Sequence, residues 1–442
     1  LVLYFACLDQ RYLDLGLRIA EQAEGEPHTR LLSQALAGAD PSEIATGKAY
    51  QLLWNLVGLA KLHRATGDEK YLTAVRNLWT AVREHHLTLG GGPWGGVAHR
   101  SREVFNPAAV FDPDGYVETC STMAWIQLNR ELLGILGEAR FAQEIERSAY
   151  NDLIGAQAPD GEDWCYYCFP NGRRVHTTYW RCCKSSGAMA IEELPAIAYA
   201  VTRDGGIAVN LLGPGEVRFA LPGGAVRVRQ ETSYPFDGKI EIIVETDSPT
   251  EFPLRVRIPD WADGAQLTVA GKAVAAPAGD YVRLLRRWQS GDRVVLTLPM
   301  RPALHRATQR NVQESLAPDG SPVAQQVMHY DYLAITRGPL VQATGLIDGY
   351  KLNETLRFDG EPEIEEEDGR LFLKPMGRAP IPFEPWFSLG GRRDGRWGVT
   401  WMPLAPEDDG WCWRGVFFSP DRPRCFAGGP MRAAWRMSSV PP

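Results

Sequence analysis

The spacing of apolar residues divides the chain into a helical first part and a β-rich remainder. Between Tyr50 and Arg64, apolar residues recur with the period of a helix that buries one face. The segment after Thr66-Gly67-Asp68 repeats this pattern, following a glycine stop and a capping aspartate. Further helices are predicted at 119–136, 141–154 and 191–201.

A short polar turn followed by a helix that opens with an aromatic residue occurs three times, at 9–13, 68–72 and 137–141. Repeated helical hairpins indicate a toroid or solenoid of helix pairs, although antiparallel helices in general share such turns. A glycine-rich break at 90–96 interrupts the helices. A long loop inside a compact domain is usually functional.

After residue 201 the pattern changes to short runs, most of them rich in Val and Ile, that are separated by turns. Such runs predict antiparallel β-sandwich modules. The runs lie at 217–220, 226–229, 239–245, 254–258, 266–269 and 293–298. The polar segment 303–325 predicts a crossing loop, and 332–341 predicts another strand.

We therefore expect a multidomain α+β protein, in which a helical toroid is followed by antiparallel β-sandwich modules. The expected domains are a helical catalytic domain at 1–201, a β-sandwich module at 202–302 and a further β-rich region at 303–442. The pattern does not assign the last hundred residues of this third region.

Composition and charge narrow the functional classes. The net charge is -7 and Lys and Arg do not cluster, so we expect no nucleic-acid partner. No apolar run reaches the roughly 18 residues of a membrane span, and the first residues lack the basic start of a signal peptide. We therefore expect no membrane partner and a cytoplasmic location. The 8 cysteines are too few for a disulfide scaffold, and their clustering indicates a metal or catalytic site.

Two short pairs of potential metal ligands carry the candidate chemistry. Glu118 and Cys120 are two positions apart at a predicted helix start, and Cys182 and Cys183 are adjacent just before another. Zn²⁺ takes four ligands from thiolates, imidazoles and carboxylates, so one ion could join the two helix ends. A thiolate that stays deprotonated in such a site can attack carbon.

Spacing alone leaves three other interpretations open. Cys165 and Cys168 could join Cys182 and Cys183 in a purely structural zinc knot. Cys182 and Cys183 could instead form a vicinal disulfide. All of these residues could also be ordinary buried thiols.

Five further side chains near the cysteines are candidates for acid/base chemistry or for sugar contact. Glu103 could act as a general acid/base across a cleft, although a single Glu is more often a solvated surface residue. His99 lies four residues earlier, and a lone His is more often structural. Trp164, Tyr166 and Tyr167 carry rings that commonly stack on sugars, although such rings more often belong to the core.

The string at 116–120, Tyr-Val-Glu-Thr-Cys, resembles the signature of glycoside hydrolase family 127 and its relatives, the β-L-arabinofuranosidase-like proteins. The Cys182-Cys183 pair resembles theirs as well. So do the segments 66–72, 147–151 and 336–340. The resemblance covers roughly residues 45–345, and the combination of Glu-Thr-Cys with Cys-Cys is its specific part.

This resemblance implies an (α/α)6-barrel-like catalytic domain with one zinc ion, and a retaining hydrolase acting on a non-reducing-end sugar. The implied substrate is an oligosaccharide or glycan that carries a β-L-arabinofuranoside or a related sugar. The implied residues are the zinc ligands Glu118, Cys120, Cys182 and Cys183, the nucleophile Cys182, the acid/base Glu103 and the substrate-site aromatic Tyr167. Because a thiolate replaces the usual carboxylate, we expect Glu103 and Cys182 to lie roughly 5–5.5 Å apart.

The chain also departs from the family pattern. Lys184 and Ser185 follow the cysteine pair where many members have Pro and Asn, and Leu52 stands about where members carry a sugar-contacting His. The identity of the sugar therefore stays open. About seven helices are predicted where the family barrel needs twelve, so we expect an N-terminal part of the barrel to be missing.

Two competing functions remain. One is a non-catalytic carbohydrate-binding protein with a structural zinc site, which would place Glu103 away from the cleft. The other is a polysaccharide lyase on an α/α toroid, with a base near Tyr167 and His176. The sequence leaves the oligomeric state open, a homodimer included.

Overall fold

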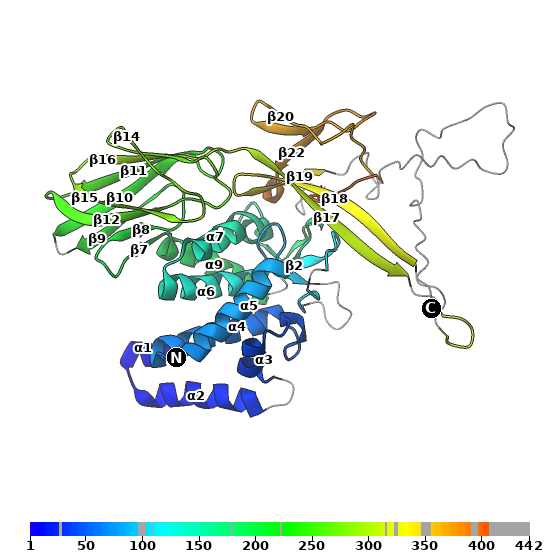
Figure 1. Ribbon diagram of the computed structural model, residues 1–442, viewed down its shortest axis with the longest axis horizontal. Coiled ribbons are helices and arrows are strands. Elements are labelled where there is room, and N and C mark those ends of the chain that lie inside the picture. The colour runs from blue at the N-terminus through cyan, green and yellow to red at the C-terminus, as the bar shows by residue number, and fades with distance from the viewer. Residues whose placement is uncertain are drawn as a thin grey trace.

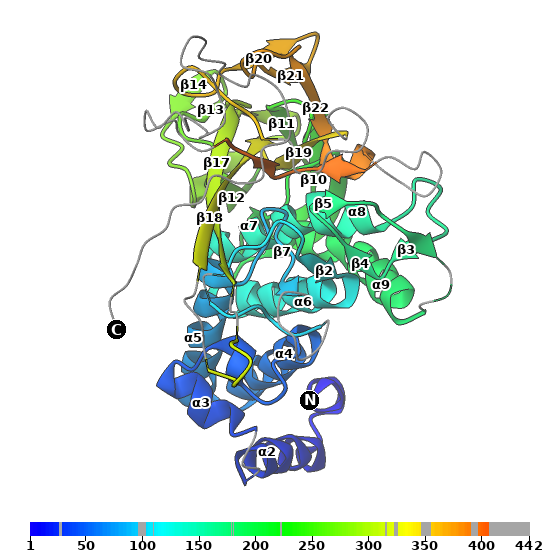
Figure 2. The same ribbon diagram turned by 90° about the vertical axis from the view of Figure 1, so that its right-hand side faces the viewer.

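The structure is a computed structural model that describes residues 1–25, 29–95, 103–108, 110–177, 179, 181–221, 223–313, 316–321, 326–345, 355–389 and 397–405. Helices form one end of the molecule and strands form the other (Figures 1 and 2). The fold is thus a mixture of helices and several sheets, most of whose strand pairs are antiparallel. No helix among these residues combines the length and the apolar character that crossing a bilayer requires.

The helices occupy the first part of the chain and are joined largely by short turns. They are α1 (Val2–Cys7), α2 (Gln10–Gly25), α3 (Leu31–Ala37), η1 (Pro41–Glu43), α4 (Ala49–Thr66), α5 (Glu69–His85), α6 (Thr119–Leu136), α7 (Ala139–Ser148), η2 (Ala149–Leu153), α8 (Ile154–Ala156) and α9 (Arg181–Ala198). The repeat predicted from the sequence coincides with the starts of α2, α5 and α7. Leu56 of α4, Leu78 of α5 and Trp125 of α6 are fully buried in one shared core.

The turn between α4 and α5 has the predicted chemistry. Gly67 adopts a left-handed conformation (φ 72°), and its amide donates to the carbonyl of His63 at 2.8 Å. The Asp68 side chain then accepts from the amide of Lys70 at 3.0 Å and caps α5. A glycine stop and an aspartate cap therefore set the two helices antiparallel.

Short strands lie beside the N-terminal ends of α6 and α9. One sheet has the order β1 (Trp94–Gly95), β2 (Tyr116–Glu118) and β4 (Tyr167–Cys168). A second pairs β3 (Trp164–Cys165) with β6 (His176–Thr177). In the first sheet Glu118 is the direct partner of Tyr167. Two segments that carry candidate site residues are thereby held side by side.

Two sheets pack face to face after α9 and share one apolar core, which includes Val228 and Ile242 from one sheet and Leu254 and Leu284 from the other. The first has the order β14 (Lys272–Val274), β13 (Gln266–Val269), β16 (Asp292–Thr297), β11 (Lys239–Thr246), β10 (Gly224–Thr232) and β9 (Gly215–Leu221). The second has the order β15 (Tyr281–Trp288), β12 (Thr250–Arg257), β8 (Ile207–Val209) and β7 (Tyr199–Val201).

A further sheet extends past this sandwich. Its main path is β17 (Pro302–Gln313), β18 (Gln326–Arg337), β19 (Leu340–Gly345), β22 (Ile381–Pro385), β21 (Arg370–Leu373) and β20 (Ile364–Glu367). Three short strands attach to it, β5 (Asn171–Gly172), β23 (Gly398–Val399) and β24 (Met402–Pro403), and η3 (Trp386–Ser388) follows β22. β17 and β18 form a long hairpin that points away from the sandwich (Figure 1).

Three predicted boundaries are wrong. The segment 303–325 was expected to be a crossing loop, but most of its first half is strand β17, paired with β18 from Pro302–Arg337 to Gln313–Gln326. The strand expected at 332–341 is divided between β18 and β19 by the turn at Gly338. The helix expected at 191–201 begins ten residues earlier at Arg181 and ends at Ala198, after which Tyr199–Val201 is strand β7.

Candidate metal and active site

The four predicted ligands lie at two neighbouring helix N-termini. Glu118 is the N-cap residue of α6, and Cys120 lies in the first turn of that helix. Cys182 and Cys183 lie in the first turn of α9, which packs against α6. The sequence predicted the cysteine pair just before a helix, whereas the pair lies inside the first turn of α9. Helix N-termini carry partial positive charge, which favours thiolates and carboxylates.

The sulfur atoms of three cysteines converge in the space between these helix ends. The Sγ atoms of Cys120 and Cys183 are 3.3 Å apart, and those of Cys182 and Cys183 are 3.9 Å apart. All three sulfurs lie within 4.8 Å of one another. Two sulfurs bound tetrahedrally to one zinc ion at about 2.3 Å lie about 3.8 Å apart, so the cluster has the right size for this ion. A vicinal disulfide would need about 2.05 Å, and all three residues are free thiols.

The predicted carboxylate ligand lies next to this cluster. Glu118 Oε1 is 4.0 Å from the Cys183 sulfur, and Ser121 donates to Glu118 Oε2 at 3.0 Å. Burial, followed by the charge of Cys120, raises the pKa of Glu118 to about 8. The hydrogen bond with Cys183 lowers the pKa of Cys120 to about 6, and the pKa of Cys183 rises in response. The raised pKa values mean that the metal-free site holds protons that a bound cation would displace, and three thiols beside a carboxyl group are a donor set that fits zinc.

Cys165 and Cys168 do not belong to this group. Within the described part of the chain, the only set of three or more closely spaced metal-binding side chains is that of Cys120, Cys182 and Cys183. Cys165 and Cys168 are both buried in a separate apolar cluster and interact with each other. This arrangement does not support the structural-knot interpretation.

Glu103 is held by hydrogen bonds to both of its carboxylate oxygens. Lys48 Nζ donates to Oε2 at 2.7 Å, and the Tyr166 hydroxyl donates to Oε1 at 2.5 Å. Burial by itself raises the pKa of Glu103, but the hydrogen bonds from Lys48 and Tyr166 outweigh burial, and the net shift is downward. The charge of Glu103 also contributes, after burial and the charge of Cys120, to the raised pKa of Glu118. The expected Glu103–Cys182 separation stays a prediction.

The aromatic residues predicted at the substrate site differ in exposure. The rings of Tyr166 and Tyr167 are half-buried with centroids 4.4 Å apart, and Tyr167 also contacts Tyr116 at 4.4 Å. Trp164 is only 3% exposed, and its ring packs against Gly187 of α9. Contact between these residues and a sugar stays a prediction, and for Trp164 the structure shows a core position. His99 lies outside the described residues.

Two residues from the start of α4 reach the site although the sequence did not single them out. Lys48 contacts Glu103, and the pKa of Tyr50 is raised by burial and by the negative charge of Cys120, Glu118 and Cys182. The packing of α4 against α6 and backbone hydrogen bonds to the segment of Glu103 bring them there, so no local signal marks them. Leu52, in the same helix, is 4% exposed and belongs to the helical core.

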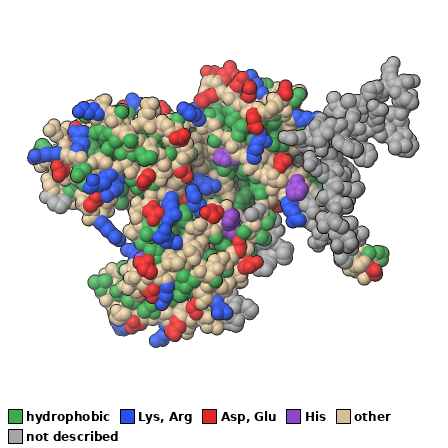
Figure 3. Space-filling view, in the orientation of Figure 1, with side chains coloured by type: hydrophobic (Ala, Val, Ile, Leu, Met, Phe, Trp, Pro, Cys, Tyr) green, Lys and Arg blue, Asp and Glu red, His purple; other side chains and the backbone are tan. Residues whose placement is uncertain are grey.

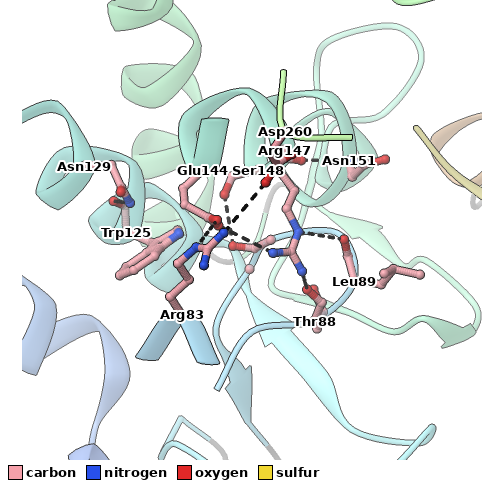
Figure 4. A network of polar contacts seen from close by, with 12 residues as sticks. Arg83, Thr88, Leu89, Trp125, Asn129, Glu144, Arg147, Ser148, Asn151 and Asp260 are labelled. Atoms are coloured by element: carbon pink, nitrogen blue, oxygen red, sulfur yellow. Dashed lines mark hydrogen bonds and ion pairs between the residues drawn. The ribbon is translucent and has the colours of Figure 1, made fainter. Parts of the chain in front are cut away.

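A network of hydrogen bonds around α7 and η2 supports the sheet that contains β2, whose last residue is Glu118. Arg147 donates to the carbonyls of Thr88 and Leu89, at 2.5 and 3.0 Å (Figure 4). Asp152 accepts from the Gly92 amide at 2.6 Å. The glycine-rich segment is thereby fixed before β1, which pairs with β2. The segment 147–151, noted in the sequence for its family resemblance, therefore has a supporting role here.

The described charges are mixed on the face in view. Lys and Arg side chains are interspersed with Asp and Glu over both the helical and the strand-rich parts (Figure 3). The candidate site is therefore distinguished by its own charged groups, those of Lys48, Glu103 and Glu118, and not by a charged surface around it.

Comparison with known proteins identifies relatives of this architecture. A family model described as the catalytic domain of GH127 beta-L-arabinofuranosidase matches residues 1–196, and one for the GH127 middle domain matches residues 206–300. A non-reducing end beta-L-arabinofuranosidase of Bifidobacterium longum subsp. longum is 25% identical over 339 residues, which are 71% of this chain and 48% of the relative. The chain thus spans about half the length of this curated relative.

Solved structures with a similar fold include two that are described as GH127 enzymes. A GH127 beta-L-arabinofuranosidase from Geobacillus stearothermophilus T6 has a TM-score of 0.70 at 22% identity, covering 91% of this chain and 70% of that one. A GH127 beta-arabinofuranosidase has a TM-score of 0.72 at 21% identity, covering 91% and 67%. The two family models match most of the chain, and the fold agrees with them. The chain belongs to glycoside hydrolase family 127.

Proposed function

We propose that this chain is a retaining glycoside hydrolase in which Cys182 is the nucleophile and Glu103 is the general acid/base. Its zinc ligands are Glu118, Cys120, Cys182 and Cys183, and its substrate carries a non-reducing-end β-L-arabinofuranosyl or related sugar. The choice of sugar follows from the similarity to the Bifidobacterium non-reducing end beta-L-arabinofuranosidase. The helical part, expected at 1–201 from the sequence, corresponds to part of an (α/α)6 toroid, and its last three residues form strand β7 of the sandwich. A β-sandwich module expected at 202–302 and a β-rich region expected at 303–442 follow.

The observation that carries this proposal is the difference in exposure among the clustered cysteines. Cys182 is exposed, whereas Cys120 and Cys183 are buried. A nucleophile must reach its substrate, whereas a residue that only binds metal can lie behind the ion. Cys182 meets both requirements because its sulfur belongs to the cluster and the residue is exposed.

The reaction then has two steps. In the first, Cys182 Sγ attacks the anomeric carbon, a carbon–sulfur bond forms, the glycosidic carbon–oxygen bond breaks, and Glu103 gives its proton to the leaving oxygen. In the second, Glu103 takes a proton from water, whose oxygen attacks the same carbon and releases the Cys182 thiolate. Burial and the charge of Cys120 raise the pKa of Cys182, so a positive charge is needed to hold its thiolate at neutral pH. Bound zinc supplies that charge.

The carboxylate form of Glu103 suits the second step of the reaction, whereas the first step needs the protonated form. Its lowered pKa favours the carboxylate in the free site, which is the form that accepts a proton from water. We therefore expect kcat/KM to fall as pH rises through the pKa of Glu103 in the free enzyme.

Kinetics with aryl β-L-arabinofuranosides that carry good and poor leaving groups test the proposal. Cys182→Ser should abolish turnover of both substrates, because an alkoxide is scarcely available near neutral pH. Glu103→Gln should slow the poor-leaving-group substrate by about 10²–10⁴-fold and the good one far less, since the latter needs no proton. Cys7→Ser, at an exposed cysteine of α1, is the control.

If Cys182→Ser retains its activity, Cys182 is not the nucleophile. If the wild-type chain binds arabinose-containing glycans but hydrolyses no furanoside or pyranoside, the carbohydrate-binding interpretation would replace the enzyme. A pH profile of kcat/KM on the wild-type chain completes the set, and an alkaline limb that persists in Glu103→Gln would contradict the acid role.

A further inference from the structure

We propose that Lys48 is a positioning residue that holds the Glu103 carboxyl group in place for proton transfer. This inference rests on the proposed function and adds a residue to it. Lys48 is the N-cap residue of α4, and its Nζ lies 2.7 Å from Glu103 Oε2. Tyr166, from the turn before β4, holds the other oxygen, Oε1, at 2.5 Å. Each oxygen of the carboxyl group is therefore fixed by a different part of the chain.

The backbone around Lys48 is joined to the backbone around Glu103. The amide of Ala49 donates to the carbonyl of Glu103 at 3.0 Å, and the amide of Phe105 donates to the carbonyl of Gly47 at 2.9 Å. Between these bonds, Lys48 and Val104 form an antiparallel bridge. The Lys48–Glu103 ion pair thus joins two segments whose backbones are held in fixed register. An ion pair between freely moving surface side chains lacks this constraint.

Gly47 permits this close approach. It adopts a left-handed conformation (φ 68°), and a Cβ atom there would overlap the Ser42 carbonyl and meet Val104 Cγ1 at 2.8 Å. A larger residue would separate the two segments. The geometry around the ion pair therefore depends on a backbone position that suits glycine.

The groups that face Glu103 differ in charge. Lys48 from the start of α4 is cationic, Tyr166 and Tyr167 present hydroxyl groups, and Glu118 from the end of β2 is acidic. The two contacts from Lys48 and Tyr166 together fix the orientation of the Glu103 carboxyl group. The Lys48 and Glu103 side chains are 35% and 22% exposed, so solvent screens the pair only in part.

Substitution of Lys48 should therefore reproduce, in weaker form, the leaving-group dependence expected for Glu103→Gln. In Lys48→Met, kcat/KM should fall by about ten- to a hundredfold for an aryl β-L-arabinofuranoside with a poor leaving group. With a good leaving group, the loss should be much smaller because no proton is needed. Lys48→Arg should restore part of the lost activity, and Tyr166→Phe should show the same selective loss.

Lys70→Met is the matched control, because Lys70 forms an exposed ion pair with Asp68 at 2.8 Å on the helical surface. It should leave both rates unchanged, and the Tm and zinc content of Lys48→Met should match those of the wild-type chain. Equal loss on both substrates, or no loss on the poor one, would overturn the role of Lys48. If the wild-type chain hydrolyses neither substrate, the proposed function is wrong, and so is the positioning role of Lys48.

Discussion

Cys182 and Cys183 are adjacent in sequence but have different surroundings. Cys183 is 1% exposed and lies 3.3 Å from the Cys120 sulfur, whereas Cys182 is exposed. Successive residues in a helix point about 100° apart, so one side chain of a pair in the first turn can face the protein while the other faces outward. Spacing alone could not separate the two cysteines. The choice of Cys182 required the family resemblance, and its exposure supports that choice.

The first prediction concerns metal content. Elemental analysis of freshly prepared, reduced protein should find about one zinc per chain. Cys120→Ser should lose most of this metal, because Cys120 is buried between the two helix ends. Cys7→Ser should keep it. Full zinc content in Cys120→Ser, or none in the wild-type chain, would be inconsistent with the proposed site.

Zinc affinity should also depend on pH. The metal-free site holds a proton on Glu118 below a pKa of about 8, and zinc must displace that proton. Affinity measured by chelator competition should therefore weaken as pH falls through this value. Glu118→Gln should bind zinc more weakly and with a shallower pH dependence. Identical pH dependence in the two proteins would show that Glu118 is not a ligand.

At the scale of elements, the sequence predicted best where apolar side chains mark one face. The starts of α2, α5 and α7 and several sandwich strands follow from such patterns. The start of α9 was missed because its buried residues there are small, namely Cys183, Ser186 and Gly187. Strand β17 was missed because its outward positions are polar, for example Arg306, Thr308 and Arg310, and long backbone pairing with β18 stabilises it instead.

The small residues of α9 allow the close contact that sets the cysteine pair. A Cβ atom on Gly187 would overlap the ring of Trp164. Gly187→Ala should therefore lower the free energy of unfolding by about 1–3 kcal/mol, despite the better helix propensity of alanine. Gly134→Ala in α6 is the matched control, since nothing lies within 4 Å of a Cβ there. Chemical denaturation measures both, and equal effects would show that Trp164 can move aside freely.

At the scale of the whole molecule, a buried ion pair joins the helical part to the sandwich. Arg257, the last residue of β12, is 0% exposed and pairs with Glu146 of α7. It also donates to the Gln143 side chain at 2.8 Å and to the Asn210 carbonyl at 2.5 Å. A charge this deeply buried is satisfied only when both parts of the chain are in place. The sequence could not predict this pair, because its partners are more than a hundred residues apart.

Loss of one partner of this pair should be costly. Arg257→Met leaves the Glu146 carboxylate buried without its cation, and should lower the free energy of unfolding by about 3–5 kcal/mol. Arg255→Met is the control on the same strand, because the Arg255–Asp204 pair is partly exposed and should contribute little to stability. Denaturant titration distinguishes them. Equal stability of the two variants would mean that the two parts of the molecule do not depend on this pair.

The convergence of Cys120, Cys182 and Cys183 was predictable from sequence with the help of the family resemblance, whereas the supporting contacts of the site were not. The string around Glu118 and the Cys182–Cys183 pair each place two potential ligands close together along the chain, but spacing alone left other arrangements of the cysteines open. Lys48 and Tyr50 reach the site through long-range contacts, namely the packing of α4 against α6 and the backbone pairing of Lys48 with Val104, and the neighbouring segments carry no motif that shows it.

In the proposed mechanism, Cys182 forms the covalent bond to the sugar. Mass spectrometry of the full-length chain after reaction with a mechanism-based β-L-arabinofuranosyl electrophile tests it most directly. We expect one adduct per chain on Cys182, formed more slowly in Glu103→Gln when the electrophile has a poor leaving group. An adduct on Cys183 or on a carboxylate would contradict the assignment of the nucleophile.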